Sequence, residues 1–535
     1  MEFTYESKAA EDAKEYLELC DEGHVVVDYY GDDIDKIATE LEKSKGKSDD
    51  FAYAYCRFVV RQSNDVKPAQ IAKILSSKSD DVRFKTMLGK FYLDGYGVEK
   101  DDDKAFQIFS EAASEGYAVA DYMLGLCYEN GNGVKKNVKQ AVELYEKAAK
   151  LGLSEALKKL GESYAIGDIV KKNPKLSVAF YEQSSKQDDG EAEFALAKFY
   201  SCGFGVKKNL NTALTYYTLA ANKGVTDAQI QLGTMYLTGN GVGANLKQAA
   251  EFFTKAAERG NAEAQLQLAN CYRLGNGVSE DMEKAFLWYE KSALQGNHNA
   301  EYHLANCYDS GIGVKKSYAN AAKWMEKAAT SGDAAAQCKL AVYYQIGQGV
   351  SRNDEAAYEW FKKASEKNPP VDGDYGTAFA KLALADCLMS GKGVDKDEKK
   401  AIAIYNEFVK QKNPLAFYKL GIAYENGAGV KVDYKKAANF YYKAAEQRNA
   451  EAQCAMGTLF ERGLGVKKNG ETAYKWYELA SHNSYNACYR LGLCCRDAIG
   501  TEKNLKEAKA WFEKAIEGGH KEAKAALKKL EAKKK

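Results

Sequence analysis

Apolar residues recur at helical spacing along most of the chain. In the stretch 120–152, Leu124, Cys127 and Tyr128 stand at positions i, i+3 and i+4, and a second apolar series includes Tyr145. This spacing places apolar side chains on one face of a helix. A glycine-containing turn separates the two series, so the stretch predicts two amphipathic helices joined by a short turn.

This pattern of helix, turn and helix repeats twelve times. The turn ends in Val or Thr at Val98, Val134, Val170, Val206, Val242, Val278, Val314, Val350, Val394, Val430, Val466 and Thr501. The spacing is 36 residues throughout, except for 44 before Val394 and 35 before Thr501. A fixed period of this length indicates a solenoid, in which neighbouring repeats share one continuous core.

Two further positions recur in every repeat. The first helix carries Gly or Ala, which we call the small residue, at 89, 125, 161, 197, 233, 269, 305, 341, 385, 421, 457 and 492. A small residue lets another helix approach closely. The second helix follows a residue with a good N-cap side chain, namely Asp101, Asn137, Asn173, Asn209, Asn245, Asp281, Ser317, Asn353, Asp397, Asp433, Asn469 and Asn504.

The repeats follow the motif Leu-Gly-x-x-Tyr-x-x-Gly-x-Gly-Val-x-Lys-Asn, then Lys-Ala-x-x-x-Tyr-x-x-Ala-Ala, and the residues from Leu124 to Ala149 match it except for Gln140 in place of the second Lys. This motif resembles the Sel1-like repeat, a longer relative of the tetratricopeptide repeat. The resemblance covers about 80–518 and implies an all-α, right-handed superhelical solenoid of about twelve antiparallel helix pairs with helical caps. Local departures occur, such as Ile169 in place of the second turn glycine of the third repeat.

The repeat pattern divides the chain into five parts. Residues 1–80 match poorly and are expected to form a degenerate helical N-terminal cap. Two blocks of repeats follow, eight in 81–366 and four in 377–518. Between them, 367–376 is a Pro- and Gly-rich insertion that cannot continue a helix, and we expect a hinge there. Residues 519–535 are expected to form a Lys-rich capping helix.

Charge and composition exclude several classes of function. The chain has 76 Lys and Arg against 75 Asp and Glu, so no net field attracts nucleic acid or an anionic membrane. The first residues lack a signal-peptide pattern, no apolar run is long enough to span a bilayer, and no Asn-x-Ser/Thr acceptor occurs. We therefore expect a cytoplasmic protein with no membrane insertion.

The sequence predicts no cofactor and no metal. The Gly-x-Gly turns lack a preceding strand and the third glycine of a dinucleotide-binding loop. His303 and Cys307 stand four apart on one helix, but no further ligands accompany them. The cysteines fall about one per repeat, which favours small buried residues over disulfides.

No local signature of catalysis is present, and we expect a protein that is not an enzyme. Some bacterial relatives rich in cysteine have been linked to binding or hydrolysis of β-lactams. Those relatives carry paired cysteines within each repeat, and this chain lacks that pairing. A hydrolase of this type remains the alternative prediction.

The resemblance implies that the first helices line a concave face and contact ligands there. The positions three before, one after and four after the small residue are expected to face this groove. The predicted peptide-binding residues are Tyr122, Asn270, Arg273, Tyr302, Asn306, Asp309 and Tyr418. Asn270 and Asn306 could clamp a peptide backbone, because amides both donate and accept hydrogen bonds. The alternative is that Tyr302 and its equivalents only pack between helices.

These observations predict a non-enzymatic scaffold or adaptor that binds protein or peptide partners and acts as a monomer. The resemblance includes adaptors of signalling complexes and of ubiquitin ligases in endoplasmic-reticulum-associated degradation. The missing signal peptide, glycosylation acceptors and membrane anchor argue against the second of these assignments.

Overall fold

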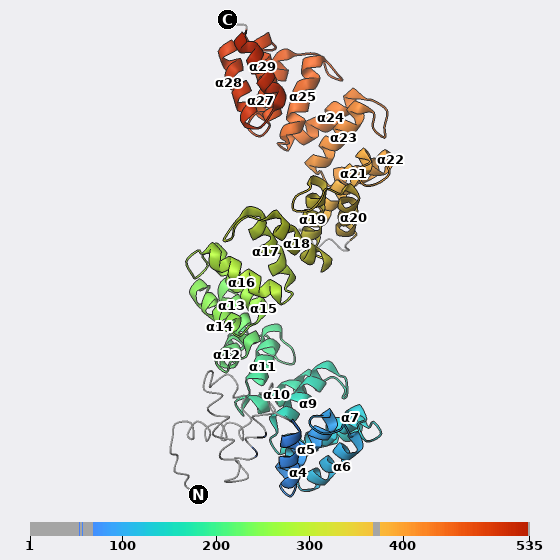
Figure 1. Cartoon of the computed structure of the whole chain (residues 1–535), viewed down its shortest axis with the longest axis vertical. Helices are drawn as coiled ribbons and strands as arrows, with labels where there is room; N and C mark the ends of the chain where they lie inside the picture. The colour runs from blue at the N-terminus through green and yellow to red at the C-terminus, as the bar shows by residue number, and fades with distance from the viewer. Residues whose placement is uncertain (1–52, 54–55, 57–67, 367–374, 533–535) are drawn as a thin grey trace. The chain divides into compact units, whose positions relative to one another are not determined.

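The computed structural model describes Tyr53, Cys56 and residues 68–366 and 375–532 of the chain. The described residues form 26 helices and no strand, and successive helices run side by side (Figure 1). The chain divides into two compact units, Met1–Asp281 and Met282–Lys535. Most of the N-terminal cap that we expect at 1–80 lies outside the described residues, as does most of the insertion.

Within the first unit, a leading helix is followed by alternating first helices, with odd labels from α5, and second helices, with even labels. The helices of this unit are α4 (Pro68–Ser77), α5 (Val82–Asp94), α6 (Asp102–Ser114), α7 (Ala118–Asn130), α8 (Val138–Lys150), α9 (Ser154–Ile166), α10 (Pro174–Ser185), α11 (Gly190–Cys202), α12 (Leu210–Asn222), α13 (Thr226–Thr238), α14 (Leu246–Glu258) and α15 (Ala262–Leu274).

The second unit continues the alternation and ends in an unpaired helix. Its helices are α16 (Met282–Leu294), α17 (His298–Ser310), α18 (Tyr318–Thr330), α19 (Ala334–Ile346), α20 (Asp354–Ser365), α21 (Tyr375–Ser390), α22 (Glu398–Lys410), α23 (Pro414–Asn426), α24 (Tyr434–Glu446), α25 (Ala450–Arg462), α26 (Gly470–Ala480), α27 (Tyr485–Asp497), α28 (Leu505–Glu517) and α29 (Lys521–Ala532).

The turn between the two helices of a repeat follows the predicted chemistry. Gly131 ends α7 with a left-handed φ of 85°, and its N–H donates to the carbonyl of Cys127. Asn137 then caps α8, because its side chain accepts a hydrogen bond from the backbone N–H of Gln140. A cap of this kind satisfies one of the N–H groups that a helix start leaves without a partner.

The second glycine of the turn joins one repeat to the previous one. At Gly349, φ is 72°, and a Cβ would overlap the backbone carbonyl of Tyr318, at the start of the preceding second helix. By contrast, the nearest atom to a Cβ at Gly347 is the Cβ of Arg352 at 3.4 Å. The second glycine therefore allows direct contact between the backbones of neighbouring repeats.

The small residue of the first helix lies against an aromatic ring of the second helix. A Cβ on Gly125 would stand 2.6 Å from Cε1 of Tyr145, and a Cβ on Gly457 would stand 2.5 Å from Cε1 of Tyr477. Both rings are fully buried. The predicted close approach of the two helices is therefore confirmed.

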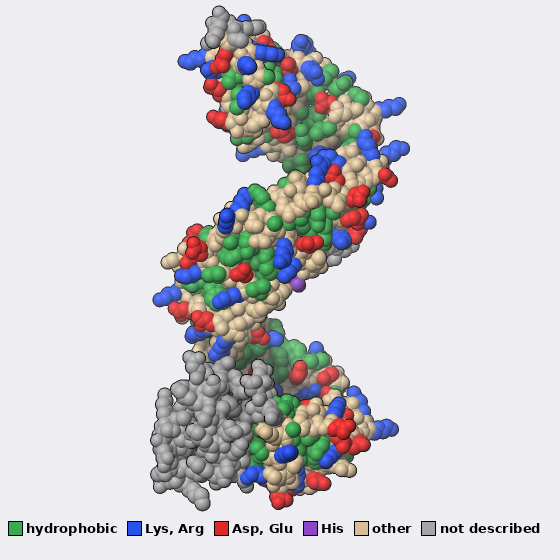
Figure 2. All heavy atoms as spheres, in the orientation of Figure 1, with side chains coloured by type: hydrophobic (Ala, Val, Ile, Leu, Met, Phe, Trp, Pro, Cys, Tyr) green, Lys and Arg blue, Asp and Glu red, His purple; other side chains and the backbone are tan. Residues whose placement is uncertain are grey.

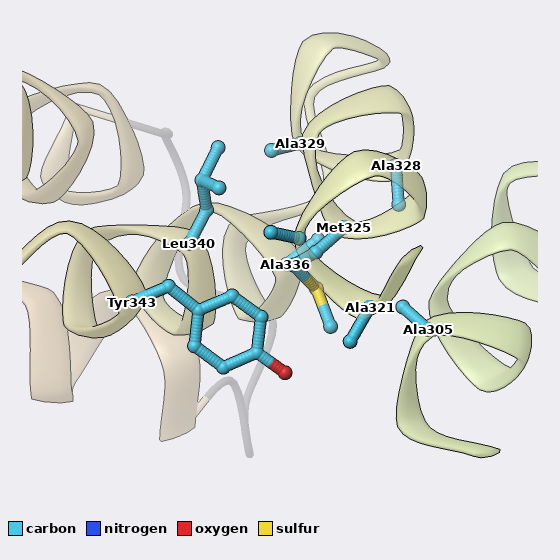
Figure 3. Packing of buried hydrophobic residues seen from close by; sticks show 9 residues of the cluster. Ala305, Ala321, Met325, Ala328, Ala329, Ala336, Leu340 and Tyr343 are labelled. Carbon is cyan, nitrogen blue, oxygen red and sulfur yellow. The ribbon is translucent and has the colours of Figure 1, made fainter. Parts of the chain in front are cut away.

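The core of one repeat is built from alanines around a few large side chains. In Figure 3, Met325 of α18 lies among alanine side chains of the same helix, and Leu340 and Tyr343 of α19 face it. These three large residues are at most 2% exposed. Small residues fill the remaining space, so helices from consecutive repeats pack at close range.

Hydrogen bonds from buried glutamines link consecutive repeats. Gln337 donates from Nε2 to the carbonyl oxygen of Ala329, at 3.0 Å, and Gln453 donates to that of Ala445, at 3.2 Å. Each acceptor is the last alanine of the preceding second helix. Each carbonyl also accepts a backbone hydrogen bond from the turn that follows its helix, from Gly332 and Arg448 respectively, so the glutamine adds a second donor that ties the next repeat to this helix end.

The last helix, α29, covers the end of the final repeat. Ala523, Ala526 and Leu530 are buried, and they pack in one cluster with Cys488 and Phe512. The exposed residues of the helix include Lys521, Glu522, Lys524, Lys528, Lys529 and Glu531. The packing thus gives α29 one apolar side and one polar side.

Candidate partner-binding face

Three side-chain positions on each first helix form the candidate partner-binding face, which we call the first-helix face. They are the positions three before, one after and four after the small residue. Four predicted residues lie on described first helices in the second unit: Tyr302, Asn306 and Asp309 on α17, and Tyr418 on α23. All four side chains are half-buried.

On α17, the structure brings Asn306 and Asp309 together through a lysine of the next first helix. Lys339 of α19 donates from Nζ to Oδ1 of Asn306, at 2.5 Å, and pairs with Oδ2 of Asp309, at 2.9 Å. Gln348, in the turn after α19, donates to Oδ1 of Asp309. These contacts fix Asn306 with its oxygen turned toward Lys339, which leaves its two N–H donors for other partners.

The predicted aromatic residues of this face each pack against the large core residue of their own repeat: Tyr122 against Tyr145, Tyr418 against Tyr441, and Tyr302 against the cluster around Met325. The rings of Tyr122 and Tyr145 are 5.5 Å apart, and those of Tyr418 and Tyr441 are 5.8 Å apart. Tyr302 packs against the cluster around Met325 shown in Figure 3. Burial raises the pKa of Tyr418 to about 12, so this hydroxyl stays protonated at neutral pH.

The remaining two predicted residues lie in the first unit. Asn270 and Arg273 are half-buried on α15, which ends at Leu274. Asn306 belongs to the second unit, so the clamp formed by Asn270 and Asn306 stays a prediction.

Sequence reasoning missed the partner of the carboxylates on this face. In three repeats, a Glu four residues after the small residue accepts a hydrogen bond from the buried tyrosine of the second helix of the same repeat. The hydroxyl of Tyr145 donates to Glu129 at 2.6 Å, and that of Tyr441 donates to Glu425 at 2.5 Å. Tyr477 donates to Glu461 in the same way, at 2.6 Å.

In the ninth repeat, the carboxylate that accepts from the buried tyrosine stands one helical turn earlier on the first helix. Tyr405 donates to Oδ1 of Asp386, which stands one residue after the small residue. Burial and the nearby carboxylate together raise the pKa of Tyr405 well above its usual value. Tyr405 therefore stays neutral and donates its hydrogen bond to Asp386, so the phenol does not act as a general base.

Several of these carboxylates form an ion pair with a lysine of the following repeat. This lysine stands two residues before the small residue of the next first helix. Lys159 pairs with Glu129 at 2.9 Å, and Lys419 pairs with Asp386 at 2.7 Å. Lys339 holds Asp309 in the equivalent arrangement, where Met325 replaces the tyrosine.

The sequence carried a signal for this arrangement. Repeats with Tyr145, Tyr441 or Tyr477 on the second helix have Glu four residues after the small residue. Repeats with Phe109 or Phe253 at the equivalent core position have Leu93 and Leu237 instead. A buried hydroxyl needs an acceptor and a phenyl ring does not. The pairing holds only in these repeats, since Tyr181 stands with Ala165 and Tyr289 with Arg273.

The cysteines contribute no disulfide within the part of the chain that the structure describes. Eleven are free thiols, and Cys202 is the exposed one among them. Burial raises the pKa of Cys271 to about 11 and that of Cys454 to about 12. These thiols are therefore protonated and poorly nucleophilic at neutral pH.

No group of three or more His, Cys, Asp or Glu side chains with a metal-binding arrangement occurs in the described ranges. His303 instead stacks on the ring of Tyr289, with centroids 5.0 Å apart. None of the described helices is long and apolar enough to cross a membrane. On the surface visible in Figure 2, Lys and Arg are interspersed with Asp and Glu around hydrophobic side chains.

Comparison with known proteins places these observations in one family. The Sel1 repeat profile matches the chain twelve times, at residues 85–117, 118–153, 154–189, 190–225, 226–261, 262–297, 298–333, 334–369, 378–413, 414–449, 450–485 and 486–520. A search of curated protein sequences found no match.

Two solved structures illustrate the similarity. One is c5321, a protective antigen present in uropathogenic Escherichia coli strains displaying an SLR fold. It is 32% identical to this chain, with a TM-score of 0.68 over 86% of this chain and 97% of that one. The second is a Sel1 repeat protein from Oxalobacter formigenes, also 32% identical, covering 46% of this chain and 96% of its own, with a TM-score of 0.40. The predicted all-α solenoid of twelve helix pairs is confirmed, and the chain belongs to the Sel1 repeat family.

Proposed function

We propose that this protein is a non-catalytic scaffold or adaptor that binds protein or peptide partners on its first-helix face. A Sel1-repeat solenoid is an architecture suited to protein interaction, since its stacked helices present many side chains along one face. The partner-binding residues that we propose are those predicted from the sequence: Tyr122, Asn270, Arg273, Tyr302, Asn306, Asp309 and Tyr418.

One observation carries the proposal. The buried framework is repeated closely, but the position one after the small residue changes its chemistry from repeat to repeat. It is Lys198 in the fourth repeat, Asn306 in the seventh, Asp386 in the ninth and Ile422 in the tenth. All but exposed Lys198 are half-buried beside aromatic rings or charged groups. Such a series offers a different contact at each step, which suits an extended peptide.

The finer assignments are also proposals. We propose a cytoplasmic monomer that joins signalling or protein-degradation complexes. Hydrolysis of a β-lactam remains the alternative, and the raised pKa of the buried thiols argues against their use as nucleophiles. Turnover of a chromogenic β-lactam by the purified chain would overturn the non-catalytic assignment.

The test is affinity purification with mass spectrometry, comparing the wild type with two variants. Tyr302→Ala/Asn306→Ala changes the first-helix face, and Lys323→Ala changes an exposed side chain of the second helix α18. We expect the first variant to lose partners that the second variant and the wild type retain. Equal recovery from all three proteins would contradict the assignment of these residues to the partner-binding face.

A further inference from the structure

In the tenth repeat, the carboxylate Glu425 lacks the lysine that pairs with the equivalent carboxylate in the second repeat. Its residues Tyr418, Tyr441 and Glu425 match Tyr122, Tyr145 and Glu129 of the second repeat position by position. In the second repeat, Lys159 completes the group. The residue of the eleventh repeat that is equivalent to Lys159 is Ala455.

The two groups have nearly the same geometry. Tyr122 and Tyr145 meet at 5.5 Å with an interplanar angle of 44°, and Tyr418 and Tyr441 meet at 5.8 Å and 41°. In both, the core tyrosine donates to one carboxylate oxygen, at 2.6 Å and 2.5 Å. The second oxygen of Glu129 takes Lys159, whereas no Lys, Arg or His of the described residues pairs with Glu425.

The second repeat also shows what kind of group completes the site. Nζ of Lys159 lies 2.9 Å from Glu129 and 6.0 Å from the ring centroid of Tyr145. A cation there gains both a charge-assisted hydrogen bond and attraction to the aromatic face. The nearest equivalent lysine on α23, Lys419, is already paired with Asp386 at 2.7 Å.

From this comparison we infer that Glu425, Tyr441 and Tyr418 form a binding site for a lysine or arginine side chain of a partner peptide. The partner cation takes the place that Lys159 occupies in the second repeat. Ala455 is half-buried and carries only a methyl group where the third repeat carries Lys159. The inference rests on the proposed function, because it specifies the partner of the same first-helix face.

The experiment uses the full chain as bait for a display library of random peptides. Selected peptides are synthesised, and their Kd is measured for the wild type, Ala455→Lys, Glu425→Gln and Ala455→Ser. Ala455→Lys supplies the missing lysine from within the chain, and Glu425→Gln removes the charge while keeping the hydrogen-bond acceptor. Ala455→Ser is the matched control, because it keeps the position small and uncharged.

We expect the selected peptides to share a Lys or Arg, and both Ala455→Lys and Glu425→Gln to weaken their binding by at least about tenfold. Ala455→Ser should bind like the wild type. Thermal unfolding checks folding, and Ala455→Lys should be as stable as the wild type because its lysine pairs with Glu425.

Two results would overturn the inference and can be told apart. Peptides that lose affinity to Tyr302→Ala/Asn306→Ala but bind Ala455→Lys and the wild type equally would refute the cation site and leave the proposed function standing. A library that yields no binder, or binders insensitive to every first-helix substitution, would contradict the proposed function as well.

Discussion

Single residues on the first-helix face serve the core and the surface together. Glu425 is half-buried on the first-helix face, and it also satisfies the hydroxyl of Tyr441, whose ring is 1% exposed. The same double role falls to Glu129 and Glu461. Substitutions at these carboxylates will therefore change stability and binding together, unless the tyrosine is changed with them.

A double-mutant cycle at Tyr441 and Glu425 tests this coupling. Tyr441→Phe should destabilise the tenth repeat by about 2 kcal/mol, because it removes a hydrogen bond to a charged group. Glu425→Leu should also destabilise it, since it leaves a buried hydroxyl without an acceptor. The double variant recreates the Phe253 and Leu237 pair of the fifth repeat and should be more stable than the sum of the single effects predicts.

Native-state hydrogen exchange of amides in α23 and α24 is the suitable measurement, because a repeat array need not unfold in one step. Phe361→Tyr serves as a control, because it adds a buried hydroxyl in a repeat that has Gln345 instead of a carboxylate at the position of Glu425. Strictly additive effects at Tyr441 and Glu425 would refute the coupling.

The cysteines allow a prediction about reactivity. At pH 8 the exposed thiol of Cys202 should react quickly with a thiol reagent, and the buried thiols should react only on unfolding. Burial raises their pKa, so the reactive thiolate is scarce below that pKa. Because Cys20 lies outside the described residues, the assay uses a Cys20→Ser background. Adding Cys202→Ser should abolish the fast phase; a fast phase that persists would show that a buried thiol is accessible.

At the scale of helices and turns, the two glycines of each turn do different work. Gly347 ends α19 in the left-handed region, where a Cβ would make only ordinary contacts within its own turn, whereas a Cβ on Gly349 would overlap the backbone of Tyr318 in the previous repeat. The first glycine shapes one turn, and the second joins two repeats. Sequence reasoning found both as turn residues, but not the contact of the second.

Alanine substitutions separate these roles. Gly347→Ala should cost about 1 to 2 kcal/mol, the penalty for an L-residue in a left-handed conformation. Gly349→Ala carries the same penalty, since φ is 72°, and also forces the start of α18 to move. Its loss of stability should therefore be clearly larger. Equal changes in the urea midpoint of unfolding for the two variants would show that the contact between repeats adds nothing.

The elements were predictable because each has a local signal. Small residues, N-caps such as Asn137 and the turn glycine Gly131 are fixed by positions within one repeat. The links between repeats, such as Lys339 with Asp309 or Gln337 with the carbonyl of Ala329, join side chains from different helices. Helical spacing predicts on which face of a helix a side chain lies, but not which side chain of a neighbouring helix contacts it. These partners therefore needed the structure.

At the scale of the whole molecule, stability should be distributed along the array, since each repeat contacts mainly its neighbours. Removal of α29 would expose the apolar surface formed by Cys488 and Phe512. We expect deletion of residues 521–535 to increase hydrogen exchange in α27 and α28, with little change in α17 to α19. Uniform destabilisation across all described repeats would contradict this nearest-neighbour description.

The central claim is that partners bind the first-helix face, and site-specific photo-cross-linking tests it most directly. A photoreactive residue placed at Asn306 of α17 should form cross-links to protein partners, identified by mass spectrometry. The same residue placed at Lys323, exposed on the second helix α18, should form few or none. Cross-links of equal yield from both positions, or from Lys323 alone, would contradict the claim.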